Sequence, residues 1–190
     1  SEMCIRDRFG FEPCYVNSRL VSRGIPVSCE VDIYGALSEY IGLCISNDAV
    51  TLLDINNSVP QYIYDEDIKG KYDYKLTDTF MGFHCGNTPA CKMCDSRAVK
   101  YQLIQHRLLE PAGSEPDFTR GTLEGDIAAS DITFYRLQCN SEGELVSYVA
   151  EGEVLDVPTR SFGGIGIFAI KEMGRFYRHV LIEGNYPHHG

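Results

Sequence analysis

Apolar positions in the first part of the chain follow a helical period between two β-prone runs. The helix predicted over residues 32–46 carries one apolar face, made of Ile33, Leu37, Tyr40, Ile41 and Cys44. Asp32 suits its N-cap, because an Asp oxygen accepts hydrogen bonds from the free backbone N–H groups of a first turn. Asn47-Asp48 is expected to end the helix.

The two runs that flank this helix are interpreted as strands. The first begins at residue 24 and ends with Glu30. The second has the almost wholly apolar residues 49–53 and ends with Asp54. A strand–helix–strand unit makes its two strands parallel and usually adjacent. The pattern therefore predicts the end of a parallel-sheet α/β domain, with both carboxylates at one edge of the sheet.

The rest of the chain predicts mostly antiparallel β structure. Residues 62–74 are acidic and tyrosine-rich, which indicates a surface loop or edge. Short β-like segments are predicted at 76–81, 121–128, 132–139, 145–150 and 152–157. Residues 140–143 have hairpin-turn composition, and residues 171–179 are expected to form a short helix. We therefore expect a β-barrel-like domain to follow the α/β part.

Three parts are expected along the chain. Residues 1–8 (SEMCIRDR) resemble a sequencing adapter translated as protein, so we expect them to be non-native. Residues 9–75 are the end of the α/β domain that carries Glu30 and Asp54, and residues 76–190 are the β-rich domain. We expect a piece of a longer protein, with its amino-terminal domains missing.

The charge of the chain limits the classes of molecule that it is expected to bind. The 190 residues hold 17 Lys and Arg against 27 Asp and Glu, a net charge of −10. Nucleic-acid phosphates and anionic membrane surfaces both require a basic face, so neither is expected as a partner. No apolar run approaches the roughly 18 residues of a membrane-spanning helix. A divalent cation does suit an acidic chain, provided that some carboxylates converge.

Eight cysteines are many for this length. Most lie in apolar runs, where a free thiol behaves as a small hydrophobe, so a reducing cytoplasm is expected. His84, Cys85, Cys91 and Cys94 could form a zinc site. A closed zinc site typically takes two ligand pairs, and the chain has no second Cys-x-x-Cys. A zinc-stabilised interaction module stays an alternative.

Glu30 and Asp54 are the strongest candidates for chemistry. They lie 24 residues apart, about one strand–helix–strand unit. Neighbouring strands are about 5 Å apart, and ligands of open α/β sheets bind beyond the carboxyl ends of the strands. Two carboxylates there repel one another unless a cation binds, and hard oxygen ligands suit Mn²⁺ or Mg²⁺. The alternative is that both acids cap helices or lie solvated.

Histidines supply further candidates. His84 lies between Gly82 and Gly86, and glycine allows the backbone to approach a ligand closely. A single histidine is also often a hydrogen-bonded structural residue, so both roles stay open. His188 and His189 are either a metal-binding pair or an irregular chain end.

Four segments, in order, resemble the L-fucose isomerase / L-arabinose isomerase family. They are residues 26–37 (PVSCEVDIYGAL), 53–57 (LDINN), 83–87 (FHCGN) and 184–189 (GNYPHH). Residues 163–179 (GGIGIFAIKEMGRFYRH) are similar to the corresponding part of fucose-isomerase-like proteins. The resemblance spans residues 9–190 and corresponds to the carboxyl-terminal part of the family.

This resemblance implies an aldose–ketose isomerisation assisted by Mn²⁺, or by Mg²⁺ or another divalent cation. Carried over by motif, the implied metal ligands are Glu30, Asp54, His189 or its neighbour His188, and His84. Asn185 matches a sugar-binding asparagine of the fucose branch.

The family's chemistry assigns roles to two carboxylates. The cation acts as a Lewis acid on the open-chain sugar, Glu30 moves the proton between C1 and C2, and Asp54 relays the hydroxyl proton. The resemblance also implies a homo-oligomer, a trimer or hexamer, in the longer protein. A carbohydrate-binding relative without catalysis is the second interpretation.

Overall fold

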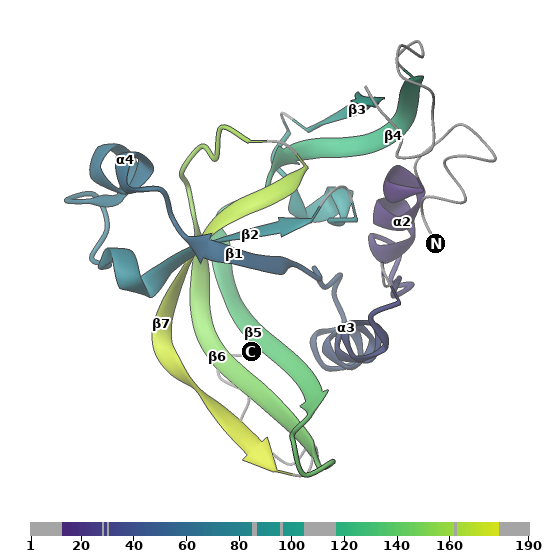
Figure 1. Ribbon diagram of the computed structural model, residues 1–190, viewed down its shortest axis with the longest axis vertical. Coiled ribbons are helices and arrows are strands. Elements are labelled where there is room, and N and C mark those ends of the chain that lie inside the picture. Colours follow the sequence, from purple (N-terminus) through teal and green to yellow (C-terminus); the bar gives the residue numbers. More distant parts are fainter. Residues whose placement is uncertain are drawn as a thin grey trace, which may run out of the picture.

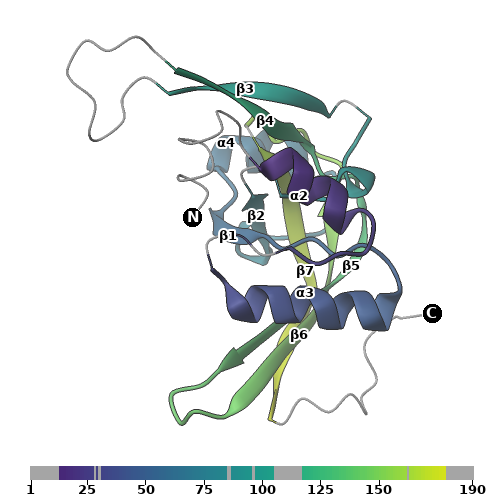
Figure 2. The ribbon, with the colours of Figure 1, turned by 90° about the vertical axis from the view of Figure 1, so that its right-hand side faces the viewer.

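A computed structural model of the chain describes residues 13–27, 29, 31–84, 87–95, 97–104, 117–161 and 163–178. Within these ranges the strands form one seven-stranded sheet. Helices α2 (Cys14–Val21) and α3 (Ile33–Ser46) lie on the same side of this sheet, and α4 (Gln61–Ile63) lies on the other (Figures 1 and 2). No described helix is long and apolar enough to cross a membrane.

The helix predicted over residues 32–46 is confirmed as α3. The Asp32 carboxylate accepts the Gly35 N–H at 2.8 Å, as expected of an N-cap. At the other end Asn47 takes the left-handed conformation, with φ 52°, and its N–H donates to the Leu43 carbonyl. Local capping chemistry therefore sets both ends of this helix.

The face that α3 buries is the polar one. Its apolar side chains are exposed at Ile33, Leu37 and Tyr40. Ser38 and Glu39 are buried, and Ser38 Oγ accepts the backbone N–H of Leu137 in strand β5 (Ser130–Cys139) at 2.9 Å. Arg136 of the same strand makes a two-pronged ion pair with Asp32, at 2.9 and 3.1 Å. These hydrogen bonds dock α3 on strand β5 of the sheet.

The predicted strand–helix–strand unit is not confirmed. Residues 25–27 and 49–53 form no regular strand, and strand β1 (Asp54–Ser58) begins at Asp54 instead of following a strand that ends there. The apolar run packs under α3, where Leu52 and Val50 approach the helix glycines Gly35 and Gly42. Contact with a helix, rather than burial inside a parallel sheet, explains its composition.

The sheet is mostly antiparallel and open. Its strands are β1 (Asp54–Ser58), β2 (Thr79–His84), β3 (Ala98–Ile104), β4 (Asp117–Asp126), β5 (Ser130–Cys139), β6 (Leu145–Leu155) and β7 (Gly164–Arg178). Strand order is β1-β2-β7-β4-β3, and β6 joins β5 to β7. Among the described strands, only the short β4–β7 pairing is parallel. The barrel-like expectation is corrected accordingly, because the described strands do not close on themselves.

The β5–β6 hairpin is confirmed at residues 140–143, where Gly143 N–H donates to the Asn140 carbonyl. The short helix predicted for residues 171–179 was wrong, since residues 171–178 continue β7. Their pairing with β6, which extends to Val146 opposite Arg178, overrides the local helical tendency. Such long-range pairing is not visible in a local sequence window.

Residues 164–169 of strand β7 are buried on both faces. Ile167 and Ala169 are fully buried with side chains from α4 and the turns around it. Phe168 points to the opposite face, where its ring stacks on Phe80 at 5.4 Å between centroids and packs with Phe134. The core therefore has two halves, one on each side of this strand.

Two glycines at the crowded centre of the sheet provide a stability test. An added Cβ at Gly152 would overlap both the Phe134 ring and the backbone carbonyl of Ala169. At Gly166 the nearest atoms are the Phe168 ring at 3.1 Å and Ile127 Cβ at 3.3 Å. We expect Gly152→Ala to lower the free energy of unfolding by about 3 kcal/mol and Gly166→Ala by about 1 kcal/mol. Urea unfolding measures both, and equal losses would contradict this packing.

Candidate functional site

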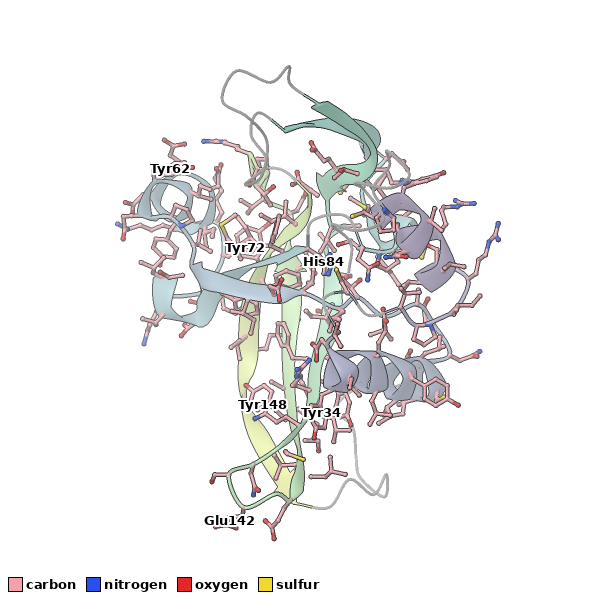
Figure 3. All side chains as sticks on the ribbon, turned by 45° about the vertical axis from the view of Figure 1, so that its right-hand side comes forward. Tyr34, Tyr62, Tyr72, His84, Glu142 and Tyr148 are labelled. Atoms are coloured by element: carbon pink, nitrogen blue, oxygen red, sulfur yellow. The ribbon has the colours of Figure 1, made fainter. Side chains whose placement is uncertain are left out.

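His84 is the last residue of β2 and is buried, with 6% of its surface exposed. It lies on the side of the sheet that faces α2 and α3 (Figure 3). Its Nδ1 accepts the backbone N–H of Asn87 at 3.2 Å. When the ring is neutral, an accepting Nδ1 leaves the proton on Nε2. The ring is therefore held by the backbone of Asn87, three residues further along the chain.

Glu39 of α3 is a buried carboxyl that the sequence did not single out. Its side chain is 3% exposed, and Oε2 accepts the backbone N–H of Val27 at 2.9 Å. Oε1 has no hydrogen-bond partner among the described residues. Burial raises the pKa of Glu39 to about 7, against the opposing effects of the Val27 N–H and of His84. An acid four residues after Gly35 and directly after Ser38 was the available signal, since small residues mark the packed side of a helix.

Asn87 completes the same buried group. It is 3% exposed, and its Nδ2 donates to the Val27 carbonyl at 2.8 Å. Its Oδ1 is unpartnered within the described part of the chain. The backbone N–H and C=O of Val27 are thus both held by buried side chains, one from α3 and one from the turn after His84. We call Val27, Glu39, His84 and Asn87 the buried polar network.

Asp54, predicted as a ligand, is the exposed first residue of β1. It pairs with Phe83 of β2, so its backbone lies one step from His84 along the ladder. Side chains alternate between faces, which places Asp54 on the face of Phe83 and Met81, and His84 on the other. The structure thus brings the two backbones together but directs the side chains apart.

Glu30, Asn185, His188 and His189 lie outside the described residues. Among the residues that are described, no three His, Cys, Asp or Glu side chains form a group that could hold a metal ion. The predicted ligand set therefore stays a prediction.

The alternative zinc site is also not assembled within the described ranges. Cys91 is exposed, Cys94 is partly buried and Cys85 is not described. Burial, together with Asp126 and other nearby acids, raises the pKa of the Cys94 thiol. Zinc binds the thiolate, so a raised pKa disfavours this residue as a ligand.

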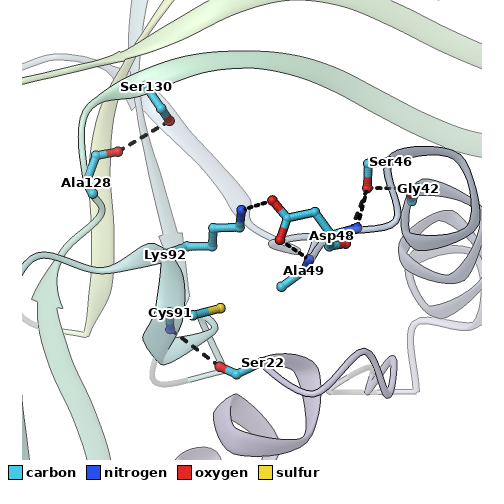
Figure 4. A network of polar contacts seen from close by, with 9 residues as sticks. All are labelled: Ser22, Gly42, Ser46, Asp48, Ala49, Cys91, Lys92, Ala128 and Ser130. Carbon is cyan, nitrogen blue, oxygen red and sulfur yellow. Dashed lines mark hydrogen bonds and ion pairs between the residues drawn. The ribbon is translucent and has the colours of Figure 1, made fainter. Parts of the chain in front are cut away.

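The turn Ala90–Lys92 anchors the helices instead (Figure 4). Lys92 forms an ion pair with Asp48, just beyond the end of α3. The backbone N–H of Cys91 donates to Ser22 Oγ, at the end of α2, at 3.4 Å. Both helices are thus attached to the segment that begins at Asn87, next to the buried polar network.

The family model for the L-fucose isomerase C-terminal domain matches residues 82–190, more than half of the chain. The chain belongs to the L-fucose isomerase family. No curated protein and no solved structure matches it. The family match begins inside β2 and includes His84 and Asn87, whereas Glu39 and Asp54 precede it. This family of isomerases is the one that the short sequence motifs indicated.

The buried carboxyl of this fucose-isomerase-like chain predicts a pH-dependent stability. Glu39 has a pKa of about 7 in the folded chain, against a usual value of 4.5. Between these values the folded chain keeps a proton that the unfolded chain has released, so the free energy of unfolding falls as the pH rises. We expect a loss of at most about 3 kcal/mol from pH 4.5 to pH 7, with a plateau above.

Urea unfolding over this pH range measures the effect, and Glu39→Gln is the control. Glutamine keeps an acceptor for Val27 but does not titrate, so the curve of Glu39→Gln lacks this contribution and keeps those of all other groups. An identical slope in the two proteins would contradict the assignment to Glu39.

Proposed function

We propose that this chain is part of a metal-dependent aldose–ketose isomerase that acts on L-fucose, L-arabinose or a related sugar through an enediol intermediate. The family match over residues 82–190 carries the proposal. The longer protein is also proposed to be a cytoplasmic homo-oligomer, a trimer or hexamer. Neither nucleic acid nor a membrane is proposed as its partner. The 190-residue chain alone is not expected to turn over sugar.

The donor set suits a hard divalent cation. Asp54 is exposed, and its carboxylate makes no hydrogen bond or ion pair with the described residues, which leaves this carboxylate available. Glu30, Asp54 and His189 or His188 would then hold Mn²⁺, a mixed carboxylate and imidazole set that this cation accepts. His84 is better suited to support than to ligation, because its side chain lies on the opposite face from Asp54.

The protein residues divide the proton transfers between them. Bound cation would supply Lewis-acid stabilisation of the negative charge that develops on the sugar oxygens. The Glu30 carboxylate takes the proton from C2 of the open-chain aldose and returns it to C1. Asp54 moves the proton between the O1 and O2 hydroxyls, and Asn185 orients the sugar.

Substitution of the proposed base tests this function. In the longer protein that contains this chain, we expect Glu30→Gln to lower kcat at least about a hundredfold in a Mn²⁺-dependent assay over a panel of aldoses. Glu142→Gln is the matched control, since Glu142 lies at the tip of the β5–β6 hairpin (Figure 3) and is exposed. Near-normal turnover by Glu30→Gln would rule out the assignment, and sugar binding without turnover by the unaltered protein would favour the carbohydrate-binding alternative.

A further inference from the structure

Helix α3 exposes a line of apolar side chains along one side. Ile33 is 73% exposed, Leu37 40% and Tyr40 55%, and Cys44 is also exposed. Their spacing of four, three and four residues places them on the same side of a helix. We call these four residues the outer face of α3.

The outer face lies opposite the side of α3 that contacts the rest of the described chain. On that inner side Ser38 and Glu39 are buried, and the helix glycines Gly35 and Gly42 lie against residues 49–53. A helix on the surface of a globular domain normally turns its apolar side to the core and its polar side to solvent. In α3 this order is reversed.

The outer face also carries no charge. Glu39 is the only charged residue among the 14 residues of α3, and it is buried on the inner side. The chain as a whole has a net charge of −10. An uncharged apolar strip on an acidic protein is typical of a surface that another apolar surface covers.

The family match indicates which surface this is. The matched C-terminal domain begins at residue 82, so α3 precedes it in the chain. The inner side of α3 contacts that domain through the hydrogen bond between Ser38 and Leu137, whereas the outer face is turned away from it. Apolar helix faces of this kind cover the sheet of an α/β domain. The outer face therefore suits a domain that precedes the C-terminal one.

A second copy of the chain suits this face less well. Two chains that each carry a net charge of −10 repel one another as they approach. A domain of the same polypeptide is held close to α3 by its covalent connection, so its docking needs no association of separate molecules.

We propose that the outer face of α3 is the docking surface for an amino-terminal α/β domain of the longer protein, whose apolar sheet packs against Ile33, Leu37 and Tyr40. This inference rests on the part of the proposed function that makes the chain a piece of a longer protein, and not on its metal chemistry. Helix α3 then joins two domains, with polar contacts to one and apolar contacts to the other.

The thiol of Cys44 reports directly on whether the outer face is covered. Iodoacetamide labelling, read out by peptide mass spectrometry, follows each thiol in the 190-residue chain and in the longer protein. We expect Cys44 to react at least about tenfold more slowly in the longer protein, because a covered thiol reacts only when the two surfaces separate. Cys14, which is 3% exposed, is the reference for a buried thiol in both proteins. Glu142→Cys, on the exposed hairpin, is the reference for a free one.

A charge on the outer face tests whether apolar contact holds the domain. Leu37→Lys places an ammonium group in the proposed interface, where its burial is costly. In the longer protein we expect this variant to return Cys44 labelling to within about threefold of its rate in the 190-residue chain. Leu37→Met, which stays apolar and of similar volume, is the matched control and should keep labelling slow. Continued protection of Cys44 in Leu37→Lys would contradict an apolar interface.

Two further results would overturn the proposal. One is equally fast labelling of Cys44 in both proteins while Cys14 stays slow. The other is slow labelling of Cys44 already in the 190-residue chain that becomes faster on dilution, since a second copy would then cover the face. Isomerase activity enters neither measurement. A longer protein that protects Cys44 but isomerises no sugar would therefore overturn the proposed function and leave the docking surface standing.

Discussion

Residues 164–169 of strand β7 are buried and paired on both edges, and the positions of the neighbouring strands follow from them. Residues 167–169 pair with β2 on one edge and with β6 on the other, so those two strands are fixed on opposite sides. Beyond the end of β6, strand β4 pairs with the same edge of β7, at Gly164 and Ile165. Gly164 lies opposite His84, and its missing Cβ makes room for Thr88. The register of this one strand therefore places the end of β2 and the turn that follows it.

The helices are attached to this framework by directed polar contacts. Ser18 of α2 donates to the buried carbonyl of Thr88 at 2.6 Å, and Ser38 and Glu39 of α3 are also buried. Hydrogen bonds depend strongly on distance and angle, so they fix the orientation of a helix more narrowly than apolar contact does. Residues 88–92 consequently connect the sheet to both helices, through Thr88, Cys91 and Lys92.

The part of the chain that matches the L-fucose isomerase family contacts, at this junction, residues that precede the match. The family match starts within β2 and contains His84 and Asn87, while Glu39 and Val27 come from the preceding part of the chain. The buried polar network is thus shared between the matched domain and the residues before it. Such sharing indicates that the segment before residue 82 is an integral part of the same folded unit.

The sequence by itself determined what depends on near neighbours: α3 with its Asp32 cap, the hairpin at residues 140–143, and the family, through short motifs. Tertiary structure decided the rest. Residues 49–53 and 171–178 were misassigned because their conformations depend on α3 and β6, which local periodicity does not report. Glu39 was missed for the same reason, since its burial follows from the side on which α3 docks. Capping and turn preferences act over a few residues, whereas burial and strand pairing are properties of the assembled chain.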